Sequence, residues 1–353
     1  MKRQLFLIGL ALSTIFGCAP QRVETGRQAK LRVGATQYAE IPADHNGDGM
    51  VNAGDILVIR QGANWNLPVD PNWVITYEQP VDPDPPTELP PQTDHHGGLK
   101  LGHGTRLANL RILPGAGNPG LAAMVSDTSD CEINNVTIQG GDHGIVNWWT
   151  PDMKSCLHAG LTLDHVDVID NTNKGGFVGV DGLTMRHCNW TDTDSHTLRL
   201  WAVRNGLIED CTFAPRKGRT NAACLKIHCD TKSGWVASED LIVRRTVVRP
   251  TAMYAITVGT QDGGKNELTR RVLLEDVTVD FQNSPAGYAL GIFANGQEIT
   301  MRRCKGINMG PEHYLIAVNK WGIGPAPTGC VIEDCTADNG KVVHKVWGDT
   351  VVR

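Results

Sequence analysis

Four side chains that could act on a carboxylated ligand occupy matching positions in two short segments. Arg199 and Trp201 alternate with leucines in LRLW, and Lys226 and His228 alternate with leucine and isoleucine in LKIH. Alternate side chains of a strand point to the same face, so the pattern predicts two strands that turn these residues outward. Two cations beside a tryptophan suit an acidic sugar, because cations bind a carboxylate and an indole packs on a sugar ring.

The same residues predict chemistry beside a carboxylate. If the ligand is a uronate polymer, β-elimination needs a base that removes the proton α to the carboxylate. Lys226 is one candidate base, because the nearby charge of Arg199 favours its neutral form. His228 is the other, because histidine titrates near neutral pH. Arg199 would neutralise the substrate carboxylate.

Flanking loops add candidate substrate-binding side chains. Asp192, Asp194 and His196 precede the first strand, and Asp230 follows the second. Asp192 or Asp194 could hold a calcium ion or a water. An alternative is a glycoside hydrolase that uses these two aspartates as paired carboxylates.

Two other interpretations of the surface remain open. A non-catalytic adhesin or structural surface protein would use the same face for binding alone. The charges could also form a solvated row, with Arg199 paired to Asp181 on the preceding coil.

The segments that must position these residues belong to a repeat in the C-terminal two-thirds of the chain. Its first apolar row is Ile133, Leu163, Met185, Ile208, Val243, Leu274, Met301 and Ile332. The second row, three residues on, is Val136, Val166, Cys188, Cys211, Thr246, Val277, Cys304 and Cys335. The third row, two residues further, is Ile138, Val168, Trp190, Phe213, Val248, Val279, Gly306 and Ala337. A repeated strand, bend and strand predicts the coils of a parallel β-helix.

Two polar residues fill each bend, and their charge mostly alternates between coils, as in Arg186-His187, Glu209-Asp210 and Arg244-Arg245. In-register coils would pair these charges, so we interpret them as structural. His165 and His187 fall in this row and are not candidate catalysts.

This architecture resembles the pectate-lyase-like, right-handed parallel β-helix superfamily. The resemblance implies an all-β fold, a single-stranded right-handed solenoid over residues 97–353. Members of that superfamily are mostly polysaccharide lyases, glycoside hydrolases and phage or cell-surface binding proteins, so an acidic polysaccharide is the expected partner. The motif set of the polygalacturonases is not matched in order, and no lyase signature is evident.

The net charge of −5 and the lack of a basic block argue against nucleic-acid binding. The repeat places several cysteines inward, which predicts buried thiols. In an oxidising compartment Cys188 with Cys211, Cys304 with Cys335, or Cys224 with Cys229 could bridge instead.

Residues 1–18 have the pattern of an export signal, with Lys2 and Arg3 before a short apolar run. The run ends in IFGC, which resembles a bacterial lipobox and implies a lipid anchor on Cys18. Ala19 then favours the outer membrane and cell surface, and ordinary secretion is the alternative. Residues 19–40 are expected to form a polar tether.

Residues 41–66 contain DHNGDGMVNAGD, which has the spacing of an EF-hand calcium loop. Its expected ligands are Asp44, Asn46, Asp48, Met50, Asn52 and Asp55, with Met50 contributing its carbonyl. The stretch resembles one half of a dockerin, followed by an exiting helix that starts at Asp55. Only one loop is present, so a cohesin partner is not favoured and a calcium-rigidified spacer is the alternative.

Residues 67–96 form a Pro-rich linker in this interpretation, with a semi-rigid extended arm at PVDPDPPTELPP. His95, His96 and His103 lie just beyond the arm. Histidine-rich tracts can bind metal, but these lack a second ligand group.

Overall fold

The computed structural model describes residues 89–353 except 102–103, 116–120, 126–129, 147–158, 219–222, 230–236, 252–253, 260–267, 283, 285–287, 320–323 and 345, together with four strands before them. The chain divides into two compact units, Met1–Glu88 and Leu89–Arg353. All the regular elements described are strands. No described helix is long and apolar enough to cross a membrane.

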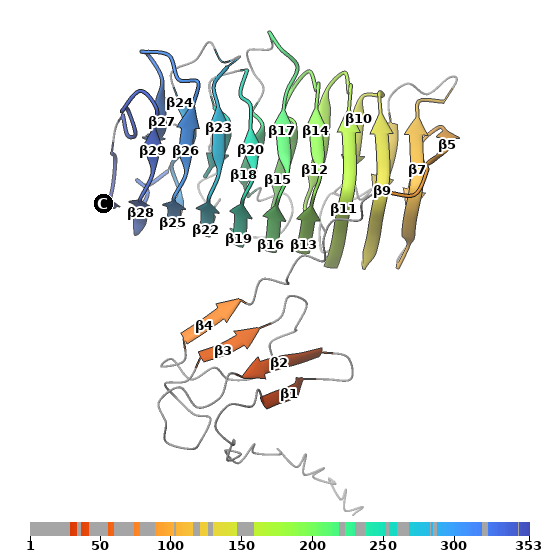
Figure 1. Ribbon diagram of the computed structural model, residues 1–353, viewed down its shortest axis with the longest axis horizontal. Helices are drawn as coiled ribbons and strands as arrows, with labels where there is room; N and C mark the ends of the chain where they lie inside the picture. Colours follow the sequence, from red (N-terminus) through yellow and green to blue (C-terminus); the bar gives the residue numbers. More distant parts are fainter. Residues whose placement is uncertain are drawn as a thin grey trace, which may run out of the picture. The chain divides into compact units, whose positions relative to one another are not determined.

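Leu89–Arg353 is a parallel solenoid whose coils lie side by side (Figure 1). One face, named sheet 1, is a nine-stranded parallel sheet. Its strands in spatial order are β6 (Leu99–Leu101), β8 (Leu121–Val125), β10 (His143–Val146), β12 (Lys174–Val178), β15 (Leu198–Trp201), β18 (Leu225–His228), β21 (Ile256–Val258), β24 (Tyr288–Ile292) and β27 (Tyr314–Val318).

The other two faces, sheet 2 and sheet 3, lie before and after the polar bend. Sheet 2 contains β13 (Asp181–Arg186), β16 (Arg204–Glu209), β19 (Ala237–Arg244), β22 (Leu268–Glu275), β25 (Gly296–Arg302), β28 (Cys330–Glu333) and β30 (Thr350–Val352). Sheet 3 contains β14 (Asn189–Thr191), β17 (Thr212–Ala214), β20 (Val247–Val248), β23 (Thr278–Asp280), β26 (Lys305–Ile307) and β29 (Thr336–Ala337). Three long strands run through both faces: β7 (Arg106–Leu113), β9 (Cys131–Gln139) and β11 (Ala159–Ile169).

The predicted register of the repeat is confirmed. Leu163 pairs with Met185 in sheet 2, and Val168 pairs with Trp190 in sheet 3. The first and third rows then continue in register through the later coils. The solenoid begins earlier than residue 97, because β5 (Thr93–His96) already pairs with β7.

The bend keeps both flanking apolar residues inside because its second residue adopts a left-handed conformation. These residues have φ between 47° and 55°: Asn109, Asn135, His165, His187, Asp210, Arg245, Asp276, Arg303 and Asp334. A left-handed residue other than glycine costs about 1–2 kcal/mol. Burial of a large aliphatic side chain contributes about 1.5–3 kcal/mol, so the rows inside each bend offset the strain.

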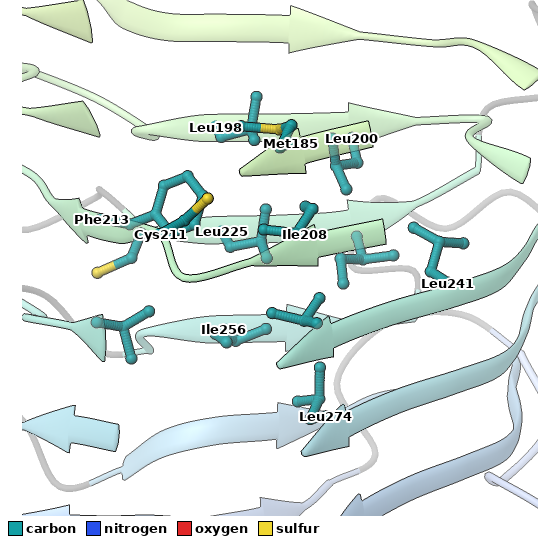
Figure 2. Packing of buried hydrophobic residues seen from close by; sticks show 14 of the residues in the cluster. Met185, Leu198, Leu200, Ile208, Cys211, Phe213, Leu225, Leu241, Ile256 and Leu274 are labelled. Atoms are coloured by element: carbon teal, nitrogen blue, oxygen red, sulfur yellow. The ribbon is translucent and has the colours of Figure 1, made fainter. Parts of the chain in front are cut away.

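Figure 2 shows the core that results, with Leu198, Leu225 and Ile256 of sheet 1 among side chains of sheet 2. All three are fully buried. Neighbouring coils therefore share one continuous apolar interior. A charge placed in these rows would affect several coils, because solenoid repeats depend on nearest-neighbour interfaces.

The bend charges form the predicted ladder. Glu209 is 3% exposed and accepts hydrogen bonds from Arg186 Nε at 2.6 Å, Arg244 Nε at 2.8 Å and Arg245 Nη2 at 2.6 Å. Burial alone would raise the pKa of Glu209, but Arg244 and Arg186 outweigh it and hold that pKa below its ordinary value.

The cysteines that the structure describes are all free thiols. Burial raises the pKa of Cys188 well above its ordinary value and that of Cys224 as well. The interpretation as buried thiols is therefore confirmed for the inward row, although Cys335 is only half-buried.

The first unit contains a four-stranded sheet in the order β1 (Ala29–Val33), β2 (Gln37–Ile41), β3 (Ile56–Ile59), β4 (Val74–Tyr77). The prediction of a helix after the calcium loop is wrong, since Ile56–Ile59 is a strand. Its sequence, ILVI, is rich in β-branched residues, which favour strands. The expected tether, residues 19–40, also contains β1 and most of β2. The expected linker, residues 67–96, contains β4 and β5. The export signal, Cys18 and the six calcium ligands lie outside the described residues.

Candidate functional site

Adjacent strands of sheet 1 bring the four predicted side chains together. β15 and β18 pair in parallel, with Arg199 opposite Lys226 and Trp201 opposite His228. The leucine and isoleucine between them are fully buried in the core, which confirms the predicted register. All four therefore belong to the outer face of sheet 1.

The four side chains were expected to be exposed on this face, and this prediction is wrong for Lys226 and His228. Lys226 is 3% exposed and His228 is 1% exposed, whereas Arg199 and Trp201 are half-buried. His228 is covered by an aromatic ring, since Trp201 stacks on it with ring centroids 5.3 Å apart. A strand pattern gives the face of a side chain, but it does not reveal what packs over that face.

Later coils of the same face are covered in a similar way. Tyr254 and Phe293 meet edge to face at 5.0 Å, and both are buried. A Cβ at Gly291 would lie 2.6 Å from the Phe293 ring, so the glycine lets that ring lie against the sheet. The outer face at β21 to β27 is thus a second apolar layer.

Arg199 and His228 are in direct contact. Arg199 Nε donates a hydrogen bond of 2.7 Å to His228 Nε2, which must therefore be the unprotonated nitrogen. Burial lowers the pKa of His228 well below its ordinary value, and the charges of Arg199 and Lys226 lower it further. His228 is a neutral imidazole whose accepting nitrogen faces an arginine.

Sequence reasoning missed three neighbours on the preceding coils. Arg199 lies over the rings of Phe177 at 5.2 Å and Trp201 at 4.4 Å, and Lys174 Nζ lies 5.0 Å from the Phe177 ring. His143 packs on Phe177 at 5.9 Å, and its Nδ1 contacts a carboxylate oxygen of Asp142. Extending the strand of LRLW back by one coil reaches KGGFV, which would have identified Lys174 and Phe177.

These neighbours make the face cationic and aromatic. Burial lowers the pKa of Lys174, with a further contribution from the Arg199 charge. Burial also lowers the pKa of His143, more than the Asp142 charge raises it. A bound carboxylate would relieve the repulsion between Lys174 and Arg199.

The loop aspartates are placed elsewhere. Asp194 forms an ion pair of 2.9 Å with Arg216 Nη1, and Arg216 Nη2 also binds the Asp192 carbonyl at 3.0 Å and Asp170 at 2.5 Å. Asp192 itself is exposed.

The remaining candidates have separate positions. His196 Nδ1 accepts a hydrogen bond of 3.1 Å from the Ala223 amide. Asp181 begins a strand of sheet 2, where it pairs in register with Arg204 and accepts a hydrogen bond of 2.7 Å from Asn205 Nδ2, whereas Arg199 belongs to sheet 1. Asp230 lies outside the described residues.

Some buried polar atoms at the site have no hydrogen-bond partner in the described part of the chain. Among them are His228 Nδ1 and Thr257 Oγ1, and Thr257 lies opposite Lys226 on β21. Buried polar groups are usually satisfied, so such atoms are expected where water or a ligand binds.

No family model and no curated protein sequence matches the chain. Among solved structures, an alginate lyase from a Paenibacillus species is similar with a TM-score of 0.55 at 11% identity, covering 84% of this chain and 93% of that one. The likeness shows the fold. It is the right-handed parallel β-helix that the repeat predicts.

Two more solved structures are similar. The A-module of a mannuronan C-5 epimerase from Azotobacter vinelandii has a TM-score of 0.33 at 9% identity, over 74% of this chain and 90% of that one. A surface adhesin of Streptococcus pneumoniae has a TM-score of 0.40 at 9% identity, over 70% of each chain.

Proposed function

We propose that the outer face of sheet 1 around β12, β15 and β18 binds an acidic polysaccharide. The observation that carries the proposal is the cluster of Arg199, Trp201, Phe177 and Lys174, which combines cations with aromatic rings on adjacent coils. Arg199 and Trp201 are half-buried, so a sugar can meet them without any rearrangement.

The shape of the sheet suits a polymer. Neighbouring strands lie about 4.8 Å apart, so equivalent positions on successive coils form a row across which a chain of sugars can extend. Along this row the guanidinium of Arg199 binds one carboxylate, and the indole of Trp201 packs on a sugar ring. The solved alginate lyase has the same fold, but the proposal rests on the side chains of this protein.

Binding is tested with the full chain by affinity electrophoresis in gels that contain a uronate polymer or a neutral glucan. Arg199→Gln and Trp201→Ala are expected to weaken uronate binding at least about tenfold, since charge-assisted contacts are the strong ones. Arg106→Gln is the matched control, because that arginine is 79% exposed on β7 and remote in the repeat from the site. Equal retardation of all variants, or retention by the neutral glucan alone, contradicts the proposal.

A β-elimination step is supported by the contact between Arg199 and His228. The single lone pair of Nε2 accepts the hydrogen bond from Arg199, so this bond must first break. With Arg199 turned to the substrate carboxylate, the freed Nε2 of the neutral imidazole takes the proton from the adjacent carbon. The electron pair forms a carbon–carbon double bond as the bond to the glycosidic oxygen breaks, and that oxygen leaves with a proton from water. Lys226, opposite Arg199, adds positive charge where the carboxylate gains electron density.

This step requires a movement that binding does not. Trp201 lies on His228, so the indole must turn aside, or the sugar must replace it, before the imidazole meets substrate. Elimination therefore requires that Trp201 first leaves His228, whereas binding does not.

Turnover is tested by the ultraviolet absorbance of an unsaturated product. His228→Asn is expected to abolish that product while uronate binding persists, and Asp194→Asn is expected to leave it unchanged. New reducing ends without ultraviolet absorbance, lost in Asp192→Asn and Asp194→Asn, would identify a hydrolase. Binding without either product would identify an adhesin and refute elimination.

We also infer an extracytoplasmic location with a lipid anchor on Cys18, from the export pattern of residues 1–18. Cys18→Ser should release the protein from the membrane fraction into the medium or periplasm. An unchanged distribution would favour ordinary secretion instead.

A further inference from the structure

Three metal-ligating side chains meet at the bend between sheets 2 and 3, away from the proposed polysaccharide face. Asp164 and His165 fill the bend of β11, and His187 fills the bend after β13 on the next coil. The Nδ1 atoms of His165 and His187 each lie 3.0 Å from Asp164 Oδ1. The three potential ligand atoms lie within 4.8 Å of one another.

The histidines depart from the charge ladder around them. In the same bend position, Asp210 and Arg245 form a bidentate ion pair, and Asp276 and Arg303 form another. At this position in the preceding pair of coils, the imidazole of His165 instead stacks on the imidazole of His187, with ring centroids 4.5 Å apart. The two rings offer no charge attraction to each other, so the group that holds them together is the carboxylate of Asp164, which both contact through Oδ1.

The geometry suits a metal ion. Imidazole nitrogens and carboxylate oxygens bind zinc at about 2.0–2.2 Å, so two ligands of one ion lie about 2.8–3.6 Å apart at octahedral or tetrahedral angles. The two distances of 3.0 Å from Asp164 Oδ1 fall in that range. A cation could replace the protons now between these atoms with small shifts of the side chains.

A neighbouring amide holds the carboxylate in position. Asn134, at the first bend position of the preceding coil, donates from Nδ2 to Asp164 Oδ2 at 3.2 Å. This contact leaves Oδ1 for the two histidines, as partners of the ligands do in metal sites. The nearest cation in register, Arg186, donates to Glu209 at 2.6 Å, which offsets its charge.

The side chains also leave room for further ligands. Their exposed fractions are 32% for Asp164, 20% for His165 and 22% for His187. A site with three protein ligands and access to solvent keeps positions for water. Two imidazoles favour zinc, copper, nickel or cobalt over calcium or magnesium, which prefer oxygen ligands.

We propose that Asp164, His165 and His187 bind one divalent transition-metal ion, with water in its remaining positions. The ion joins two consecutive coils, because His165 and His187 belong to adjacent turns of the solenoid. Metal binding therefore stabilises this part of the fold by mass action. The site is independent of the proposed polysaccharide function.

The test titrates the full chain with zinc by calorimetry and with cobalt by visible absorption. His165→Asn and His187→Asn are the informative variants, since φ is 52° at both positions and asparagine tolerates that conformation. Each is expected to weaken zinc binding more than about tenfold and to abolish the cobalt band. Asn134→Ala is expected to weaken binding about tenfold, as loss of such a partner does.

Matched controls separate this site from other ligands in the chain. Asp210→Asn changes a neighbouring bend residue, also left-handed, and should leave zinc binding intact. A double His95→Ala, His96→Ala variant and Asp44→Ala should also bind zinc normally. Zinc affinity unchanged in a folded His187→Asn variant, or lost instead in one of these controls, overturns the proposal. The absence of any cobalt band in the unmodified chain overturns it as well.

Discussion

Arg199 and His228 lie diagonally across two paired strands and share a hydrogen bond of 2.7 Å from Nε to Nε2. Because Nε2 accepts, the proton of the neutral imidazole is on Nδ1, a buried atom with no hydrogen-bond partner among the described residues. One contact thus fixes both the tautomer of a candidate base and its distance from a candidate carboxylate-binding group.

Removal of the Arg199 charge should raise the pKa of His228. Burial is the largest cause of the depressed pKa and the Arg199 charge is the second, so Arg199→Gln is expected to raise it while leaving it below its ordinary value. Titration of the histidine side-chain resonances by NMR measures the change. A His228 resonance that titrates identically in both proteins contradicts the proposed contact.

The depressed pKa of His228 also makes the fold sensitive to acid. The unfolded chain binds a proton near pH 6.5 and the folded chain only well below it, so stability is full above that pH and falls as the pH drops. His143 contributes in the same direction. His228→Asn should therefore flatten the dependence of the melting temperature on pH between about 7 and 5. An equal slope in both proteins would show that His228 is not the cause.

Glu209 should be the most costly charge to remove from the ladder. Glu209→Gln leaves Arg244 and its neighbours without their shared, buried carboxylate, and the loss of one partner in a buried ion pair costs about 3–5 kcal/mol. Urea unfolding measures this. Glu132→Gln is the control, because its side chain is 53% exposed and paired with Arg106, and it should change stability by less than about 1 kcal/mol. An equal loss of unfolding free energy in the two variants would show that burial does not determine how much a charge of the ladder stabilises the fold.

Adjacent residues of β18 should respond differently to substitution. Ile227→Asp places a charge in the core and is expected to unfold several coils, seen as lost ellipticity and rapid proteolysis. Lys226→Met fills the space of the lysine on the outer face and is expected to retain the fold while weakening uronate binding. A folded Ile227→Asp protein beside an unfolded Lys226→Met protein would be incompatible with the register of β15 and β18.

Calcium binding by the N-terminal unit remains a proposal from its loop sequence. The full chain is expected to bind about one calcium ion through side-chain oxygens of Asp44, Asn46, Asp48 and Asp55, as EF-hand loops do. Asp44→Ala should abolish the calorimetric signal, whereas Asp164→Asn should not affect it. No heat at millimolar calcium would exclude the loop as a site.

The sequence by itself determined the solenoid and its register. The apolar rows through Ile208 and Phe213 recur with one spacing, and each bend between them needs two polar residues of which the second is left-handed. Local periodicity of this kind is sufficient because each coil contacts mainly its neighbours. The same reasoning placed Arg199, Trp201, Lys226 and His228 on one face. It failed at Ile56–Ile59, where a calcium-loop pattern suggested a helix and β-branched residues form a strand.

Only the tertiary structure decided what covers that face and which side chains touch. The burial of His228 depends on the ring of Trp201, and the pairing of Asp194 with Arg216 joins successive coils through their turns. The convergence of Asp164, His165 and His187 likewise depends on side-chain rotamers in a bend. Strand periodicity fixes the direction of a Cβ but not the conformation of the atoms beyond it, so these contacts and the pKa values they set could not be predicted from spacing.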